Sequence, residues 1–531
     1  MVRLSSRITL LGTGVAGLSL VLVSASPGGT TATPSRTFGA SAQRANHWNG
    51  QRRPMQRPGR TFTTPTPCPS QTSPSVAYFT GSNNQAGGQY SVAAGVNNKA
   101  CGPDTSVMGG YGNSTDTNTD SFIGGGEDNY VTGAAFVGAG YLNYAEGFDS
   151  FVGAGGGEYF TNSSGGTTYG NKAIGEDSFV GAGDMNAINA DGGGSFIGGG
   201  GYTSASNGEY VGNSITGADS FIGAGNENYV DPSSLSAFVG AGSSNVAGGA
   251  NVFVGAGSEN LASGSNSFVG AGAENLATAF SSFIGSGGLN TIGSGANYST
   301  VSGGLQNTVS GGGYASIIGG YGNAAKGAYA TVAGGFSNTA AGELSFAAGY
   351  HADAVNNGSF VWSDYTAGSA LLKDSAKNEF LARATGGVYF YSNEGATTGV
   401  KLAPGEGAWA SASDRNAKTD IVPIDDASVL AKVAALPIDA WSYKSDRGVR
   451  HLGPMAQDFF AAFGTGVDDL HITSIDEDGV ALAAIKALHT ENEMLRSQYR
   501  AQSGVLEGRL SALAAKNAEL ERRLDALAAR I

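Results

Sequence analysis

A short hydrophobic run flanked by glycine recurs along the middle of the chain. It is most regular where Phe238, Phe253, Phe268 and Phe283 follow one another at intervals of 15 residues. Each of these belongs to a unit Ser-Phe-Val-Gly-Ala-Gly-x-x-Asn or a close variant of it. One strand-like run, two tight glycine positions and a closing asparagine in so short a period indicate a β-solenoid. We predict such a solenoid over residues 90–350, with one unit per coil.

The repeat also predicts how its side chains face. Neighbouring residues of a strand point to opposite faces, so Phe268 and Val269 cannot both enter the coil. Phe268 belongs to the most regular apolar column, and we expect it inside, where truncation to alanine would lower local stability by about 3–5 kcal/mol. We expect the closing asparagine in left-handed backbone. Because both strand faces are apolar, the second face needs another surface, which predicts a homo-oligomer.

Beyond the repeats the hydrophobic pattern changes twice. Residues 351–412 hold two further strand-like runs separated by Gly386-Gly387, which predicts a hairpin within a β-rich neck. Residues 481–531 are rich in helix formers, and their leucines alternate spacings of four and three. This heptad seam predicts a coiled coil, with one asparagine fixing its register, in preference to an amphipathic helix on a globular core. The seam consists of Leu506, Leu510, Leu513, Asn517, Leu520, Leu524, Leu527 and Ile531.

The first residues carry an export pattern. Arg3 and Arg7 precede an apolar run, which small residues and a stretch rich in Pro, Gly and Thr follow. We predict a secretory signal over residues 1–26, which would be the chain's one contact with a membrane. The alternative is that this segment is retained as an anchor. Residues 27–89, rich in Pro, Thr and Arg, are predicted to be a linker.

Composition and charge narrow the class of protein. Of 531 residues 87 are glycine and only 14% are charged, while 40% are hydrophobic. This argues against both an ordinary globular enzyme and a charge-driven disordered chain. Residues 101–412 hold six Lys and Arg against 25 Asp and Glu. Such a surface repels phosphate, so we predict no nucleic-acid partner.

Few residues of the repeats suggest metal or cofactor chemistry. Glu227, Glu259 and Glu274 recur near the unit's end, but calcium-binding repeats have a shorter period and a regular Asp, so we read these as turn residues. The histidines show no ligand spacing. We predict no metal and no cofactor. Cys68 and Cys101 are the only cysteines, and in an exported protein they can form a disulfide that pins the linker to the first coil.

The repeat resembles the heads of trimeric autotransporter adhesins, whose units of similar length carry Ser-Val-Ala-Ile-Gly. The resemblance is in period and residue class. Here phenylalanine stands where that family has a small strand residue, and Gly-Ala-Gly replaces Ala-Ile-Gly. The resemblance implies a β-roll that assembles as a homotrimer.

The most specific motif follows the neck. From Ser413 the chain reads Ser-Asp-Arg-Asn-Ala-Lys-Thr-Asp-Ile. This resembles the start of the intramolecular chaperone domain at the C-terminus of phage endosialidases and tail spikes, which opens Ser-Asp-x-x-x-Lys-x-x-Ile. Further matches to that domain follow in order at residues 441–444, 451–458 and 481–496. We therefore divide the C-terminal part into a chaperone domain, residues 413–480, and a helix with a coiled coil, residues 481–531.

The resemblance implies a self-cleaving domain. Ser413 matches the family's nucleophile and Lys418 its base, and the cut falls between Ala412 and Ser413. A lysine acts as a base near neutral pH only when burial or a positive neighbour lowers its pKa. Five residues along a straight helix would place the pair about 140° apart, so a turn or a second subunit must bring them together. The supporting residues that we predict are Asp414, Arg415, His451 and Gln457.

These expectations combine into one hypothesis. The chain is mostly β, with a solenoid or β-roll, a β-rich neck and a small α+β chaperone domain that ends in a coiled-coil helix. We expect an extracellular or cell-surface homotrimeric fibre that binds a cell-surface glycan or a host surface, with self-cleavage as its one serine-peptidase activity. The alternatives are a spike-like polysaccharide depolymerase and a phage tail fibre, each with the same chaperone.

Overall fold

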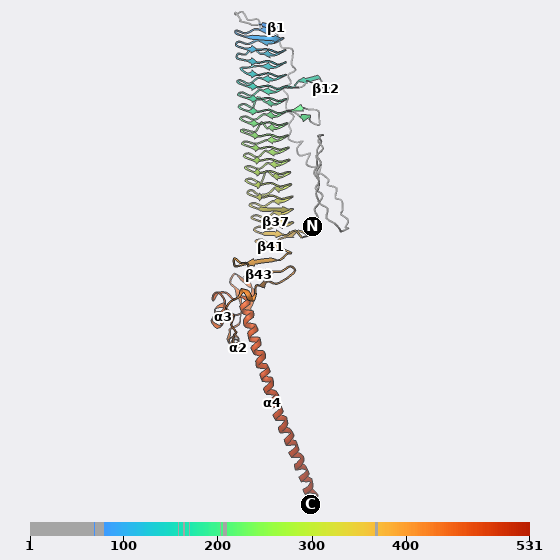
Figure 1. The fold of residues 1–531 in the computed structure, drawn as a ribbon, viewed down its shortest axis with the longest axis vertical. Helices are drawn as coiled ribbons and strands as arrows, with labels where there is room; N and C mark the ends of the chain where they lie inside the picture. The colour runs from blue at the N-terminus through green and yellow to red at the C-terminus, as the bar shows by residue number, and fades with distance from the viewer. Residues whose placement is uncertain are drawn as a thin grey trace, which may run out of the picture. The chain divides into compact units, whose positions relative to one another are not determined.

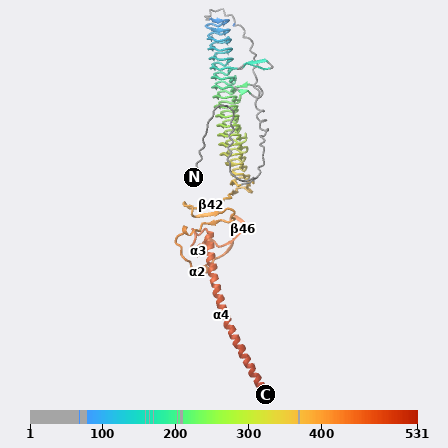
Figure 2. The same cartoon turned by 45° about the vertical axis from the view of Figure 1, so that its right-hand side comes forward.

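The computed structural model describes Cys68 and residues 79–531, apart from residues 158, 163–164, 169, 202, 205–209 and 367–369. The predicted signal and most of the predicted linker therefore lie outside the described residues. Figures 1 and 2 show the repeats as a stack of coils, which we call the rod, and a long C-terminal helix. The solenoid prediction is confirmed. The structure holds a single chain, so the trimer stays a prediction.

Each coil of the rod contributes one strand to each of two parallel sheets. In the first sheet Phe253 pairs with Phe268 of the next coil, and in the second Leu261 pairs with Leu276. The second strand of each coil was not expected from the sequence. The rod also extends past residues 90–350 at both ends, because parallel pairing begins at Phe79 and continues to Arg383.

The strands of the first sheet are β1 (Phe79–Ser82), β3 (Val92–Val96), β5 (Ser106–Val107), β7 (Phe122–Ile123), β9 (Phe136–Val137), β11 (Phe151–Val152), β15 (Phe179–Val180), β17 (Phe196–Ile197), β21 (Phe221–Ile222), β23 (Phe238–Val239), β25 (Phe253–Val254), β27 (Phe268–Val269), β29 (Phe283–Ile284), β31 (Thr300–Val301), β33 (Ser316–Ile317), β35 (Thr331–Phe336), β37 (Phe346–Tyr350), β39 (Phe360–Ser363) and β41 (Phe380–Arg383). Those of the second sheet are β2 (Gln85–Ala86), β4 (Lys99–Ala100), β6 (Ser114–Thr115), β8 (Tyr130–Val131), β10 (Tyr144–Ala145), β14 (Lys172–Ala173), β16 (Ala187–Ile188), β20 (Ser214–Ile215), β22 (Tyr229–Val230), β24 (Val246–Ala247), β26 (Leu261–Ala262), β28 (Leu276–Ala277), β30 (Thr291–Ile292), β32 (Thr308–Val309), β34 (Ala324–Ala325), β36 (Thr339–Ala340), β38 (Ala352–Ala354) and β40 (Leu372–Lys373).

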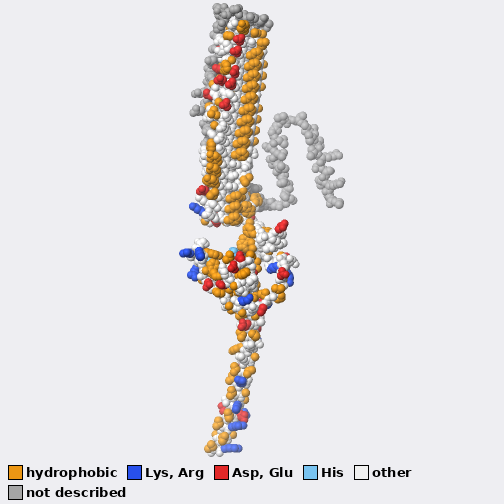
Figure 3. All heavy atoms as spheres, turned by 90° about the vertical axis from the view of Figure 1, so that its left-hand side faces the viewer, with side chains coloured by type: hydrophobic (Ala, Val, Ile, Leu, Met, Phe, Trp, Pro, Cys, Tyr) orange, Lys and Arg blue, Asp and Glu red, His pale blue; other side chains and the backbone are white. Residues whose placement is uncertain are grey.

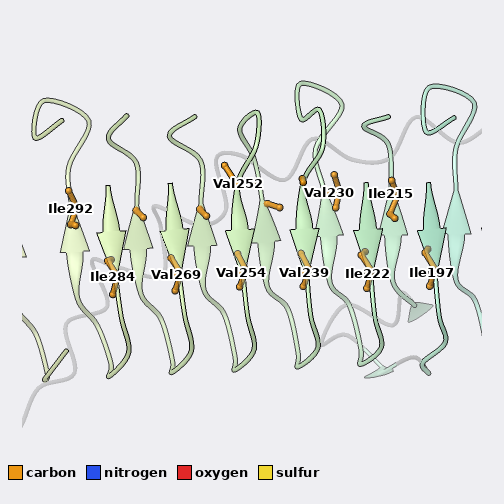
Figure 4. Close-up of a cluster of buried hydrophobic side chains, with 14 of the residues drawn as sticks. Ile197, Ile215, Ile222, Val230, Val239, Val252, Val254, Val269, Ile284 and Ile292 are labelled. Carbon is orange, nitrogen blue, oxygen red and sulfur yellow. The ribbon is translucent and has the colours of Figure 1, made fainter. Parts of the chain in front are cut away.

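The core lies between the two sheets, and each sheet contributes a single layer of side chains to it. In Figure 4 Val254, Val269 and Ile284 of the first sheet form one row, with Ile292 of the second sheet in the row opposite. All four side chains are fully buried. The prediction that Phe268 lies inside is therefore wrong. The interior pairs a Val or Ile with an Ala or another β-branched residue, and close packing leaves no room there for a phenyl ring.

Phe268 instead lies on the outer face of the first sheet, half-buried. Its ring stacks on those of Phe253 and Phe283, with centroids 4.7 and 4.9 Å away. Equivalent residues of successive coils sit directly above one another, so identical rings meet face to face. The regular apolar column of the sequence is thus an external stack.

The closing asparagines form a buried ladder. Asn275 donates its backbone N–H and its Nδ2 to Oδ1 of Asn260, at 3.2 and 3.0 Å, and Nδ2 also reaches the Gly287 carbonyl at 2.9 Å. The prediction of left-handed asparagine is wrong, because the left-handed residue is the one before it, such as Glu274 with φ of 55°. A buried ladder satisfies polar groups that would otherwise be unpaired inside the coil.

Glycine is required where successive coils approach most closely. Gly272 has φ of +111°, and a Cβ there would lie 1.9 Å from the carbonyl oxygen of Gly287. Two insertions interrupt the coils as antiparallel hairpins, which the first two figures show leaving the stack. The hairpins are β12 (Tyr159–Asn162) with β13 (Gly165–Thr168), and β18 (Thr203–Ser204) with β19 (Tyr210–Val211).

The region after the rod begins with a three-stranded antiparallel sheet. It consists of β42 (Val388–Tyr391), β43 (Gly399–Leu402) and β44 (Ala410–Ser411). The prediction of a hairpin at Gly386-Gly387 is wrong, since these residues connect β41 of the rod to β42 of a different sheet. The neck therefore contains the last coils of the rod and this separate sheet.

Residues 413–531 form the small α+β region. Its elements are the 3₁₀ helix η1 (Arg415–Ala417), α2 (Asp426–Ala435), the antiparallel pair β45 (Asp439–Tyr443) and β46 (Asp446–Gly453), α3 (Ala456–Phe463) and α4 (Ser474–Ala528). Helix α4 begins earlier than the predicted residue 481, because Thr473 caps it by accepting the Asp476 N–H. None of the described helices combines the length and apolar character needed to span a bilayer.

Candidate functional site

The predicted cleavage point follows directly after a paired strand. Ser411 of β44 pairs with Val400 of β43. The backbone N–H of Ala412 donates to the Gly399 carbonyl at 3.0 Å, which continues this pairing by one residue. The acyl side of the Ala412–Ser413 bond is thereby held by the neck sheet. No sequence pattern indicates Gly399, because the contact is made across the sheet.

A tight turn over residues 413–418 brings Lys418 back beside Ser413. The Asp414 carboxylate accepts hydrogen bonds from the backbone N–H of Asn416 at 2.9 Å and from its Nδ2 at 3.2 Å. This caps η1, and the Lys418 N–H then donates to the Arg415 carbonyl at 3.2 Å. A short polar residue hydrogen-bonded to backbone two residues on is a common turn former. The Asp-x-Asn spacing is the signal by which Asn416 could have been found.

The turn places the two predicted catalytic groups in contact. Nζ of Lys418 donates a hydrogen bond to Oγ of Ser413, and the two atoms lie 2.7 Å apart. A straight helix would have placed the two side chains on different faces, whereas the 3₁₀ turn brings them together. The arrangement is that of a serine nucleophile beside a lysine base. Both side chains are exposed in the single chain.

The other predicted supporting residues lie on three elements, η1, β46 and α3. Arg415 is the first residue of η1. His451 lies on β46, with its ring 4.7 Å from that of Trp441 and 5.6 Å from that of Tyr443. Gln457 is on the first turn of α3. Within residues 370–531, which the structure describes without a gap, no hydrogen bond or ion pair joins these three residues to Ser413.

The two cysteines form a disulfide in the structure. The Cα atoms of Cys68 and Cys101 are 5.1 Å apart, and the bond closes a loop across 33 residues. The Cys68 N–H donates to Oε1 of Gln85 at 3.2 Å, while Cys101 is buried directly after β4. The bridge joins Cys68 to the beginning of the rod.

The recurrent glutamates of the repeats occupy turns. Glu227, Glu259 and Glu274 all have φ near 55°. Oε2 of Glu227 accepts a hydrogen bond from the Ser244 hydroxyl at 3.1 Å. In the part of the chain that the structure describes, no three His, Cys, Asp or Glu side chains are grouped as metal ligands.

The chain combines a long β-solenoid with a small α+β region that has a serine–lysine pair at its start. Residues 413–468 match the family described as chaperone of endosialidase. The match begins at Ser413 and includes Lys418 and His451; the resemblance stated from the sequence extended further, to residue 531. No curated protein matches the chain. The rod and this domain together fit a tail-fibre or spike-like protein with an intramolecular chaperone.

Proposed function

We propose that this chain is a fibre protein whose C-terminal domain directs assembly and then releases itself by cutting the Ala412–Ser413 bond. The observation that carries the proposal is the 2.7 Å contact between Lys418 Nζ and Ser413 Oγ, at the first residue of the segment that matches the chaperone family. The contact is made within one chain, and the cut would act once on that chain.

The cut proceeds in two steps. Lys418, once neutral, accepts the Ser413 hydroxyl proton, and Oγ attacks the carbonyl carbon of Ala412. A C–O bond forms as the Ala412–Ser413 C–N bond breaks, and the proton passes to the Ser413 amine. Water then hydrolyses the resulting ester, which leaves a carboxylate on Ala412 and restores the serine hydroxyl.

Assembly is what would activate the pair. A solvated lysine amine is protonated at neutral pH and cannot accept a proton, whereas burial disfavours the charged form. Ser413 and Lys418 are exposed in the single chain, as are the leucines of the α4 seam. We propose that three chains associate through this seam and bury the pair, so that cleavage reports completed assembly.

The cut would leave the neck sheet complete. All three of its strands, β42, β43 and β44, precede Ser413. The hydrogen bond from Ala412 to Gly399 also lies on the fibre side of the bond. The new C-terminus therefore stays paired after the chaperone leaves, and the released fibre ends in ordered structure.

We propose that the fibre acts outside the cell, carried either by a bacterium or by a phage. The chaperone family is associated with tail proteins, and the predicted signal over residues 1–26 supports export. We propose that the acidic rod contacts a cell-surface glycan or a host surface. Release of new reducing ends from a bound polysaccharide would instead identify a depolymerase, whereas retention of intact polysaccharide supports the adhesin-like role.

Three variants of the full chain test the cleavage. Ser413→Ala and Lys418→Ala should each give one full-length band on a denaturing gel, where the wild type gives two fragments. Ser411→Ala is the matched control, because this neighbouring serine lies on β44 and should be cut normally. Normal cutting of Ser413→Ala would overturn the proposed nucleophile, and normal cutting of Lys418→Ala would overturn the proposed base.

A further inference from the structure

One continuous column of phenylalanine rings runs along the outer face of the first sheet. Neighbouring rings are parallel within 11°, and their centroids are 4.7–5.1 Å apart. Figure 3 shows hydrophobic side chains in stripes of this kind along the coils. The column consists of Phe122, Phe136, Phe151, Phe179, Phe196, Phe221, Phe238, Phe253, Phe268 and Phe283.

Stacking determines what the phenylalanine column can bind. Each ring face within it is covered by the next ring, so a sugar cannot stack on these faces, and only the ring edges are exposed. The rings are half-buried, and Phe283 at the end of the column is 40% exposed. Ten such rings leave on the order of 500 Å² of uncharged surface. Contiguous apolar patches of this size mark interfaces, and a standard interface takes about 800 Å² from each partner.

We propose that the phenylalanine column packs against the same column of a second copy of this chain, coil beside coil. The inference rests on the proposed fibre and names the surface by which its rods meet. Strands in a sheet repeat every 4.7–4.9 Å, and a partner must match this repeat over ten successive coils to cover every ring. A second rod of the same sequence has that repeat. Two such columns would together bury on the order of 1,000 Å², which is about the least that a specific interface requires.

The phenylalanine column aligns two rods but specifies their register weakly. If one rod slides by a single coil, every ring except one at each end still meets a ring. The column ends where Thr300, Ser316 and Thr331 occupy the same strand position in the next three coils, and phenylalanine returns to it in the last three, at Phe346, Phe360 and Phe380. A slip by one coil therefore buries a ring edge against a hydroxyl only at these boundaries, while most rings still meet a ring. The register between two rods must therefore be set mainly outside the repeats. We assign this role to the C-terminal domain.

A photocrosslinker within the column tests the contact directly. The full chain is made with p-benzoylphenylalanine in place of Phe253, irradiated, and analysed on a denaturing gel and by peptide mass spectrometry. We expect covalent dimers in which position 253 is joined to the coil of the second copy that contains Phe253. Crosslinks to the second sheet, or no covalent dimer from a protein whose native mass shows several chains, would overturn the inference.

A matched pair of variants identifies the face independently. Thr already occupies the column position in later coils, so the triple change of Phe238, Phe253 and Phe268 to Thr should keep the coil fold. We expect it to reduce dimer crosslinking from p-benzoylphenylalanine at position 221 at least tenfold. The control changes Leu261 and Leu276 of the second sheet to Thr, as in Thr291 and Thr308 of that sheet, and should leave crosslinking unchanged. The reverse pattern would place the contact on the second sheet.

The same samples separate the two proposals. Cleavage before Ser413 without crosslinks in the rod would overturn the proposed column contact and leave the self-releasing chaperone standing. Crosslinks in the rod without cleavage would do the opposite. Replacing Leu520 and Leu524 by Asp should spread the crosslinks over neighbouring coils if the C-terminal domain sets register. Crosslinks that stay confined to one coil in that variant would contradict this role.

Discussion

The rod and the C-terminal region bury their hydrophobic residues very differently. In the rod nearly every coil places a Val, Ile or Ala at 0% exposure, and the next coil completes each contact. In residues 413–531 the buried apolar side chains are Phe459, Ala483, Ala484 and Ala487, while Leu452 and Leu482 are 77% and 68% exposed. Each rod coil buries its apolar residues against other coils of the same chain. The C-terminal region leaves much of its apolar surface exposed, as we expect of a domain that packs against other copies of the chain.

The largest effect should come from the exposed seam of α4. Replacing Leu520 and Leu524 by Asp puts charges where three helices would meet, and should slow cleavage on the order of tenfold or more while the rod keeps its β-sheet signal. Ala515→Asp is the control, because the heptad places residue 515 away from the seam. Cleavage on a denaturing gel and circular dichroism give the two readouts. Equal cleavage rates in both variants would contradict a role for the seam.

A large local effect is expected where the rod coils touch most closely. Gly272→Ala puts a Cβ against the Gly287 carbonyl at a φ that alanine avoids, and should destabilise the neighbouring coils by about 3 kcal/mol or more. Ala273→Gly is the control, because Gly288 holds that position in the next coil, and should change stability by about 1 kcal/mol at most. Hydrogen exchange of the coil amides measures both. Unchanged protection in Gly272→Ala would refute the close contact.

Ile284 and Phe283 are adjacent on β29, but substituting them should lower the stability of the rod by different amounts. Ile284 is fully buried, and Ile284→Ala should cost about 2–5 kcal/mol. Phe283→Thr removes one ring contact at the end of the column, and should cost about 1 kcal/mol in the unassembled chain. Thermal unfolding at low protein concentration compares the two. A larger loss in Phe283→Thr would restore the interior position first expected for the phenylalanine column.

The smallest effect is the loss of stability at low pH near the end of the rod. Asp364 accepts hydrogen bonds from the Thr366 hydroxyl at 2.6 Å and from Thr385, and these lower its pKa to about 2. A depressed carboxyl pKa gives stability that is present above pH 4 and is lost as the pH falls toward 2. Asp364→Asn should flatten this part of the pH–stability curve, as followed by hydrogen exchange of β39 and β41. An unchanged curve would contradict the assignment.

The sequence was sufficient for the period of the rod because each coil repeats the same contacts. It misplaced Phe268, since alternation shows that Phe268 and Val269 face apart but does not show which faces in. The choice depends on the width of the space between two sheets, and the second sheet was not recognised. The asparagine ladder was missed for a similar reason, because Asn260 and Asn275 meet only after the coils stack.

The candidate site was predictable where it is local and not where it is distant. Ser413 and Lys418 were found through a linear motif, and the Asp414 turn that joins them is encoded in the same few residues. The hydrogen bond from Ala412 to Gly399 depends on a sheet, and the place of His451 beside Trp441 depends on a strand pair. Neither follows from residue spacing.

If cleavage follows assembly, its rate depends on how often chains meet, and refolding at several protein concentrations tests this most directly. Denatured full-length chain is diluted into native buffer, and the fragment that begins at Ser413 is followed by mass spectrometry together with the native mass. We predict no fragment in denaturant, and a rate of fragment release that rises with protein concentration and lags behind trimer formation. A rate independent of concentration, or a stable trimer that remains uncut, would contradict the account.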